Sequence, residues 1–169
     1  MTSASLLADA FGRVREVVYQ AVLGLTPEEL TFRPAPGANS ISWLVWHLTR
    51  IQDDHIAGVR AAGQVWASGG WASRFGLDAG SLDTGYGHTP EQVAKITVQS
   101  GEVLTAYYDA VHEQTIRYVT TLTDADLPRI VDKHWDPPVT LGVRLMSVIS
   151  DDLQHAGQAH YLRGMIERA

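Results

Sequence analysis

Apolar residues near the start of the chain recur every three or four positions, which is the spacing of one helical face. This pattern predicts a first helix from about Ser3 to Leu23. Its apolar positions, continued just past its end, are Leu7, Phe11, Val14, Val18, Ala21 and Leu25. Gly24 is expected to end the helix, because glycine suits the left-handed conformation of a C-terminal cap. The residues Thr26-Pro27-Glu28-Glu29 then predict a short capped helical turn.

A second helix is predicted after a loop. Residues 33–39 contain two prolines and a glycine, a composition typical of a loop. Asn39 or Ser40 can cap the helix that follows, which is expected to run to about Ala62. The inner face of this helix includes Leu44, His47, Leu48 and Ile51. One imidazole is therefore expected among apolar neighbours.

A long connection follows from Gly63 to His88, rich in Gly, Trp and Ser and without a sustained period. Ordered connections of this length are more often functional lids or crossovers than idle loops. Thr89-Pro90-Glu91-Gln92 repeats the capped start and is expected to open a long third helix. The apolar positions of that helix are Val103, Tyr107, Val111, Tyr118 and Leu122.

The C-terminal part predicts a loop and a last helix. After a short turn at Thr123, a loop is expected from Asp132 to Val139, and Thr140 opens the final helix. The apolar stripe of that helix consists of Leu141, Leu145, Val148, Leu162 and Ile166, interrupted by His155. Four helices with one long crossover predict an all-α four-helix bundle, and we expect a single domain over residues 1–169.

Composition narrows the range of partners. The net charge is −6, and the thirteen Lys and Arg residues are dispersed, so a nucleic-acid partner is not expected. There is no Cys, which excludes disulfides, thiolate ligands and a thiol nucleophile from this chain. The N-terminus lacks a basic segment followed by an apolar run, and no apolar run is long enough to span a bilayer. We therefore expect a cytoplasmic protein without a membrane partner.

The candidate chemistry lies in the last helix. Asp151 and His155 are four residues apart, so their side chains can face one cation from adjacent helical turns. Both would interrupt an apolar face, where an unsatisfied polar group costs about 1–3 kcal/mol. His47 from the second helix would complete a metal site. Two imidazoles and a carboxylate match open sites in which a fourth position is left for water or substrate.

Other interpretations of these residues stay open. A histidine on an inner helix face can be a core residue bonded to a backbone carbonyl, and Asp152 can replace Asp151 as the ligand. His160 is rotated by about 140° from His155 and is expected to face elsewhere. Gln158, one turn after His155, can orient a ligand or bind a cofactor, or it can be a surface amide.

Several residues outside the triad are candidates for lining the site. His134 and Trp135, in the loop before the last helix, can overhang the metal and bind a cofactor. Trp66 and Trp71 in the crossover can do the same, and Asp54 and His55 can line the cavity. The alternative for the loop and crossover residues is ordinary packing or a dimer contact, because Trp is enriched at interfaces.

Trp46-His47-Leu48, together with Asp151-x-x-x-His155-Ala156-Gly157-Gln158, resembles the DinB-like superfamily of metal-binding four-helix bundles over nearly the whole chain. The resemblance implies a divalent metal held by His47, Asp151 and His155. Most members have a histidine where this chain has Asp151. The carboxylate resembles the branch that contains the N-terminal domain of mycothiol-dependent maleylpyruvate isomerase.

The resemblance therefore implies a metal-dependent enzyme that activates water or a low-molecular-weight thiol similar to mycothiol. Zinc is the expected metal, with nickel as the alternative, and transfer, isomerisation and hydrolysis all stay open. A rival hypothesis is a non-catalytic metal- or ligand-binding bundle of a stress response, and a third is a bundle that binds no metal. The resemblance and the Trp-rich crossover also predict a homodimer.

Overall fold

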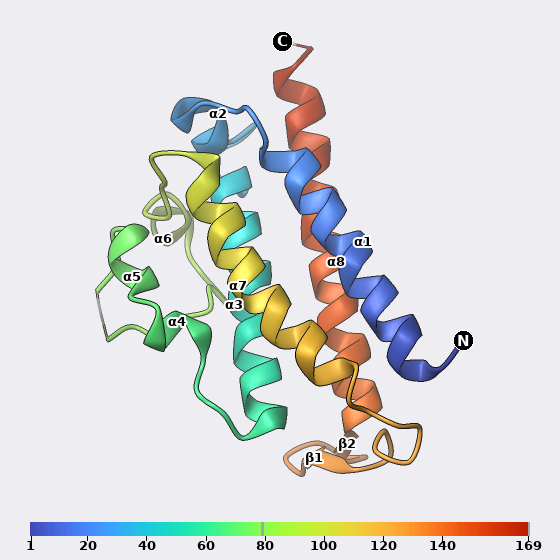
Figure 1. Ribbon diagram of the computed structural model, residues 1–169. Helices are drawn as coiled ribbons and strands as arrows, with labels where there is room; N and C mark the ends of the chain where they lie inside the picture. Colours follow the sequence, from blue (N-terminus) through green and yellow to red (C-terminus); the bar gives the residue numbers. More distant parts are fainter. Residues whose placement is uncertain (79, 169) are drawn as a thin grey trace.

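The computed structural model describes residues 1–78 and 80–168. The long helices are α1 (Ser3–Val22), α3 (Ile41–Arg60), α7 (Gly101–Val119) and α8 (Leu141–Ile166). They pack as a bundle in which α3 and α8 run in opposite directions along one another, and α1 lies against α7 and α8 (Figure 1). The predicted all-α four-helix bundle is confirmed. In the described parts of the chain, no helix has the length and apolar character needed to cross a bilayer.

The predicted starts of α3 and α8 and the predicted end of α1 are confirmed by their caps. The Ser40 hydroxyl accepts a hydrogen bond from the backbone N–H of Trp43, and that of Thr140 accepts one from Val143. Each bond satisfies an N–H group that has no partner within its helix. Gly24 follows α1 with a φ of +79°, as expected for a residue that reverses the chain after a helix. Thr26 caps the short helix α2 (Pro27–Thr31).

The prediction for the start of the third long helix was wrong. Thr89 does cap a helix, but this helix, α6 (Pro90–Val93), ends after one turn. The long helix α7 begins only at Gly101, which lies against the end of α1. A Cβ at Gly101 would lie 2.5 Å from the Val22 side chain and 3.1 Å from its carbonyl oxygen. This contact joins segments that are far apart in the sequence. The start of α7 therefore cannot be predicted from a local pattern.

The two ends of the loop predicted at Asp132–Val139 belong to two short paired strands. Strand β1 (Ile130–Asp132) pairs antiparallel with β2 (Val139–Thr140), with Ile130 opposite Thr140. The hairpin covers the end of the bundle where α8 begins (Figure 1).

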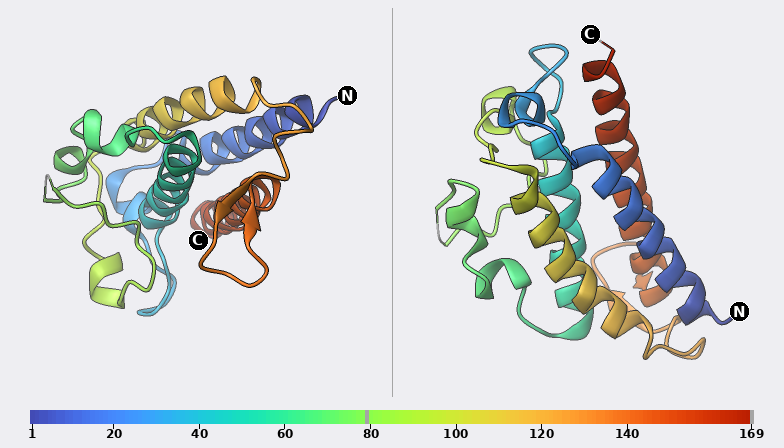
Figure 2. Two further views of the ribbon diagram at one scale, coloured as in Figure 1. Left: turned by 90° about the horizontal axis from the view of Figure 1, so that it is seen from below. Right: turned by 45° about the horizontal axis from the view of Figure 1, so that its top comes forward.

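The crossover after α3 folds onto one side of the bundle, beside α3 and α7 (Figure 2). It contains the short helices α4 (Val65–Ser68) and α5 (Trp71–Arg74). Trp66 and Trp71 are buried and pack on Tyr107 of α7, with ring centroids 5.2 and 5.1 Å from it. Both tryptophans therefore belong to the core, which removes the argument that they form a dimer contact.

Arg50 of α3 holds this crossover in place, although its side chain is fully buried. Its guanidinium donates to the backbone carbonyls of Asp83 at 3.1 Å and Leu82 at 3.2 Å. It also lies 3.4 Å from the carboxylate of Asp53. Asp53 in turn accepts hydrogen bonds from the backbone N–H groups of residues 65 and 66 at the start of α4. The charged pair thus ties both ends of the crossover to α3.

Arg50→Met should lower the free energy of unfolding by about 3–5 kcal/mol, because it leaves the buried Asp53 carboxylate without its cation. Urea denaturation followed by circular dichroism measures this loss. Arg13→Met is the matched control, since Arg13 pairs with Asp9 on the exposed surface and its removal should change stability little. Equal losses for the two variants would contradict the role given to Arg50.

Candidate metal centre

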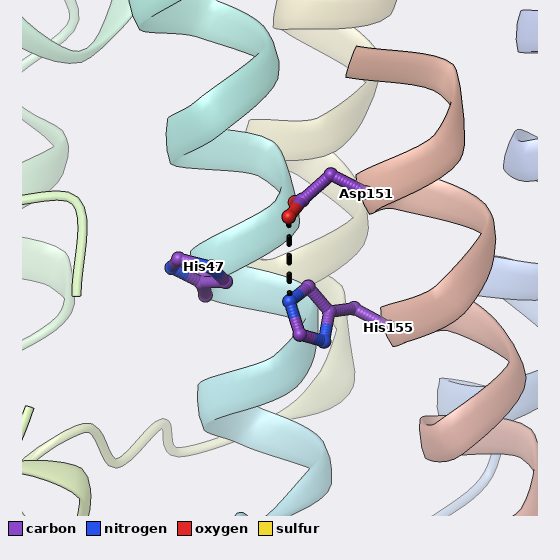
Figure 3. Close-up of side chains that lie close together, drawn as sticks. All are labelled: His47, Asp151 and His155. Atoms are coloured by element: carbon purple, nitrogen blue, oxygen red, sulfur yellow. Dashed lines mark ion pairs between the residues drawn. The ribbon is translucent and has the colours of Figure 1, made fainter. Parts of the chain in front are cut away.

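Three potential metal ligands converge between α3 and α8. His47 comes from α3, whereas Asp151 and His155 come from successive turns of α8 (Figure 3). One ligand atom from each residue lies within 4.8 Å of the other two. The Asp151 carboxylate is 3.6 Å from Nε2 of His155, and the two imidazole centroids are 4.9 Å apart. The structure thus brings together the three residues that the sequence singled out.

The ring of His47 is fixed from behind. Its Nδ1 lies 2.5 Å from the backbone carbonyl oxygen of Thr84, in the crossover. A carbonyl can only accept, so Nδ1 carries the hydrogen and the lone pair of Nε2 is left for a metal. The ring also stacks on Trp43, with centroids 4.6 Å apart. Burial lowers the pKa of His47, which favours the neutral imidazole that binds a metal.

A glycine allows this close approach of the crossover to His47. Gly85 has a φ of +88°, and a Cβ there would lie 2.7 Å from the Trp46 ring and 3.0 Å from Nδ1 of His47. The Asp83 carboxylate accepts from the backbone N–H of Gly85 at 2.8 Å. Sequence reasoning missed Thr84, because it acts through its backbone. The signal in the sequence that could have found this segment is the pair Gly85 and Gly87, because closely spaced glycines are typical of turns.

His88 connects this segment to α3, although its spacing from the other histidines gave no reason to expect a role. Its Nδ1 accepts from the indole N–H of Trp43 at 3.1 Å, so its Nε2 carries the hydrogen that is donated to Asp83 at 2.7 Å. Trp43 is therefore held by His88 on one side and stacks on His47 on the other. His88 therefore links Asp83 of the crossover to Trp43, which packs beside the triad.

His155 is oriented in the same way by its own helix. Its Nδ1 lies 3.1 Å from Oε1 of Gln158, one turn later on α8. An Nδ1–H donated to this amide oxygen leaves Nε2 facing Asp151 and His47. Of the alternatives for Gln158, the structure supports the one in which it orients a ligand.

Asp151 supplies the strongest argument for a cation. Its Oδ2 atom is buried and has no hydrogen-bond partner among the described residues. A buried carboxylate oxygen without a partner is costly unless something positive lies beside it. Within the triad, the groups beside this oxygen are the two imidazoles. The donor set therefore fits a divalent metal ion.

Comparison with known proteins identifies the family. The family model described as the DinB superfamily matches residues 10–159. The chain belongs to the DinB superfamily. A solved structure described as a conserved protein from Enterococcus faecalis is 32% identical, with a TM-score of 0.91 over 100% of this chain and 99% of that chain. No curated protein matches the chain at a significant level.

Asp152, the residue after the triad ligand Asp151, has a different environment from Asp151. Asp152 is fully buried, and neither of its oxygens has a hydrogen-bond partner among the described residues. Burial, and then the charge of Asp151, raise the pKa of Asp152 well above its usual value. The group of potential ligand atoms contains Asp151 and not Asp152.

The remaining candidates do not join the triad. His134 and Trp135 lie in the hairpin connection at the start of α8, where the His134 side chain is 96% exposed and pairs with Asp132. Trp135 is 66% exposed. His160 is exposed on α8 and is not part of the ligand group, as expected from its rotation. The structure thus leaves His134 and Trp135 without a contact to the triad among the described residues.

His55 lines a separate pocket of about 250 Å³ together with Asp54, Asp132 and Arg144. Arg144 bonds the Asp132 carboxylate at 2.8 Å and approaches Nε2 of His55 at 3.5 Å. Burial lowers the pKa of His55, and Arg144 lowers it further, while Asp54, Asp151 and Asp132 raise it. The pocket therefore holds a histidine that resists protonation.

His55 should titrate below about 6.5 in an NMR pH titration, the value of an unperturbed histidine. Since the folded protein takes up this proton less readily than the unfolded chain, its contribution to stability is lost as the pH falls through about 6.5. His55→Asn should therefore make the free energy of unfolding less sensitive to acid. A His55 pKa at or above the unperturbed value would contradict this.

Proposed function

We propose that this DinB superfamily member binds one divalent metal ion through Nε2 of His47, Nε2 of His155 and the carboxylate of Asp151. The observation that carries the proposal is the buried Oδ2 of Asp151, which has no hydrogen-bond partner in the described part of the chain. It lies beside two imidazoles whose Nδ1 atoms already take part in hydrogen bonds. Zinc is the proposed metal and nickel the alternative, because both accept imidazole and carboxylate ligands.

We propose further that the protein is a metal-dependent enzyme. Among the described residues, no fourth His, Asp or Glu offers a ligand atom within the group, which favours an open coordination position over a closed structural site. When bound, the metal supplies Lewis-acid activation of a water or thiol at that position. The chain's own contribution is to hold both imidazoles in one tautomer and to wall the site with Trp43.

A thiol substrate or cofactor would have to come from outside, because the chain has no Cys. A low-molecular-weight thiol similar to mycothiol is proposed, on the likeness of Asp151 to the carboxylate of the mycothiol-dependent branch. Transfer, isomerisation and hydrolysis are all compatible with this site. The rival function is a non-catalytic metal-binding bundle, which would require a ligand that closes the fourth position. A homodimer is still proposed from the family resemblance alone.

Elemental analysis of protein purified without an affinity tag should find one divalent ion per chain. His47→Ala and His155→Ala should each abolish stoichiometric binding, because two protein ligands are left. Asp151→Ala also leaves two protein ligands and should likewise abolish stoichiometric binding. His160→Ala and Asp152→Asn are the matched controls and should retain the metal. The assignment would be contradicted if His160→Ala lost as much metal as His155→Ala.

Gln158→Ala should weaken metal affinity by about 10–100-fold, because His155 loses the acceptor that fixes its tautomer. Gln158→Glu keeps an acceptor and should restore much of the affinity. Gln154→Ala is the control one turn earlier, since Gln154 donates to the Ser150 carbonyl and does not contact His155. Competition with a chelating indicator dye measures all three. Unchanged affinity in Gln158→Ala would show that the hydrogen bond has no role in metal binding.

A further inference from the structure

A pocket of about 470 Å³ lies between α8 and the start of α3. This volume falls within the range of about 300–1,000 Å³ typical of small-molecule sites. The residues that line it come from the loop before α3, from α3 and from α8: Ala38, Asn39, Leu44, Gln154, Gly157, Gln158, Tyr161 and Leu162. We call it the amide pocket, after its Asn and Gln side chains.

The chemistry of the lining selects an uncharged occupant. No Asp, Glu, Lys, Arg or His is among the lining residues. The polar groups are the side-chain amides of Asn39, Gln154 and Gln158 and the hydroxyl of Tyr161, all of which can both donate and accept hydrogen bonds. A carboxylate or ammonium group would find no side chain of opposite charge among these lining residues. Hydroxyl and amide groups on a partly apolar body suit this lining better.

A glycine within α8 keeps the pocket open. A helical glycine costs about 1 kcal/mol relative to alanine, yet a Cβ at Gly157 would meet nothing within 4 Å. Packing within the chain therefore does not require this glycine, in contrast to Gly101, which lies against Val22. The missing side chain leaves free volume in the wall of the pocket.

Gln158 links the amide pocket to the triad. Gln158 lines the pocket and also accepts the hydrogen bond from Nδ1 of His155. Leu44 precedes His47 by about one turn on α3, and Gln158 follows His155 by about one turn on α8. Because these helices run in opposite directions, both residues lie on the same side of the triad. The pocket therefore lies about one helical turn from the triad, within reach of a small molecule whose reactive group is at the triad.

We propose that the amide pocket binds the uncharged, hydrogen-bonding body of the molecule whose reactive group is delivered to the triad. The proposal rests on the proposed function for the identity of the reactive end, but the preference for an uncharged body follows from the pocket alone. It assigns substrate selection to residues of α8 and the loop before α3.

Pantetheine is a suitable probe, because it is an uncharged thiol with amide and hydroxyl groups. Glutathione is a thiol of comparable size that carries carboxylates and an ammonium group. In NMR titrations of the protein with and without zinc, pantetheine should shift the backbone amide of Gly157 and the side-chain amide of Gln158 saturably. Glutathione should bind about tenfold or more weakly.

Gly157→Leu should fill the pocket and weaken pantetheine binding by about tenfold or more, while an unchanged circular dichroism spectrum shows that the bundle is intact. Gly12→Leu is the matched control, because Gly12 is also a helical glycine with nothing within 4 Å of its Cβ and does not line the pocket. It should bind pantetheine like the unmodified protein.

The outcomes separate this inference from the proposed function. Protein that takes up no zinc but still shifts Gly157 and Gln158 with pantetheine would overturn the metal proposal and support the pocket. Pantetheine binding unchanged in Gly157→Leu, shifts located elsewhere, or a preference for glutathione would overturn the pocket. A dimer that Gly157→Leu converts to a monomer in sedimentation would show that a second copy, not a ligand, occupies the pocket.

Discussion

The candidate site depends on the hydrogen bonds that the buried Arg50 guanidinium makes to the crossover. The guanidinium bonds the carbonyls of Leu82 and Asp83 and so holds the crossover against α3. The next carbonyl in the chain, that of Thr84, then reaches Nδ1 of His47. Burying a charge costs free energy unless its hydrogen-bonding groups have partners. Here the backbone carbonyls, Asp53 and Tyr107 supply those partners to the guanidinium. The position of the crossover thus decides the tautomer of the first proposed ligand.

The two sides of the site are built by different means. On α8, the spacing of Asp151, His155 and Gln158 on successive turns aligns the carboxylate, the imidazole and the acceptor that orients it, and no other element is needed. On α3, His47 needs a segment far along the chain to complete its hydrogen bond. The α8 half should therefore keep its geometry when the crossover is disturbed, whereas the α3 half should not.

This difference explains what the sequence could predict. The helices with clear periodicity, the caps at Ser40 and Thr140, and the convergence of His47 with α8 all follow from local spacing and from the family resemblance. The late start of α7 depends on contact between Gly101 and Val22, and the role of Thr84 depends on a backbone carbonyl. Neither leaves a side-chain signature. Trp66 and Trp71 were ambiguous because a tryptophan packs equally well in a core or at an interface.

The most direct test of the central claim is a crystal structure of the zinc-loaded protein with anomalous diffraction measured on both sides of the zinc absorption edge. We expect one anomalous peak per chain, at about 2.0–2.2 Å from Nε2 of His47, Nε2 of His155 and an oxygen of Asp151. The fourth position should hold a water or another non-protein ligand. A peak elsewhere, or zinc bound by Asp152 with Asp151 turned to solvent, would contradict the account.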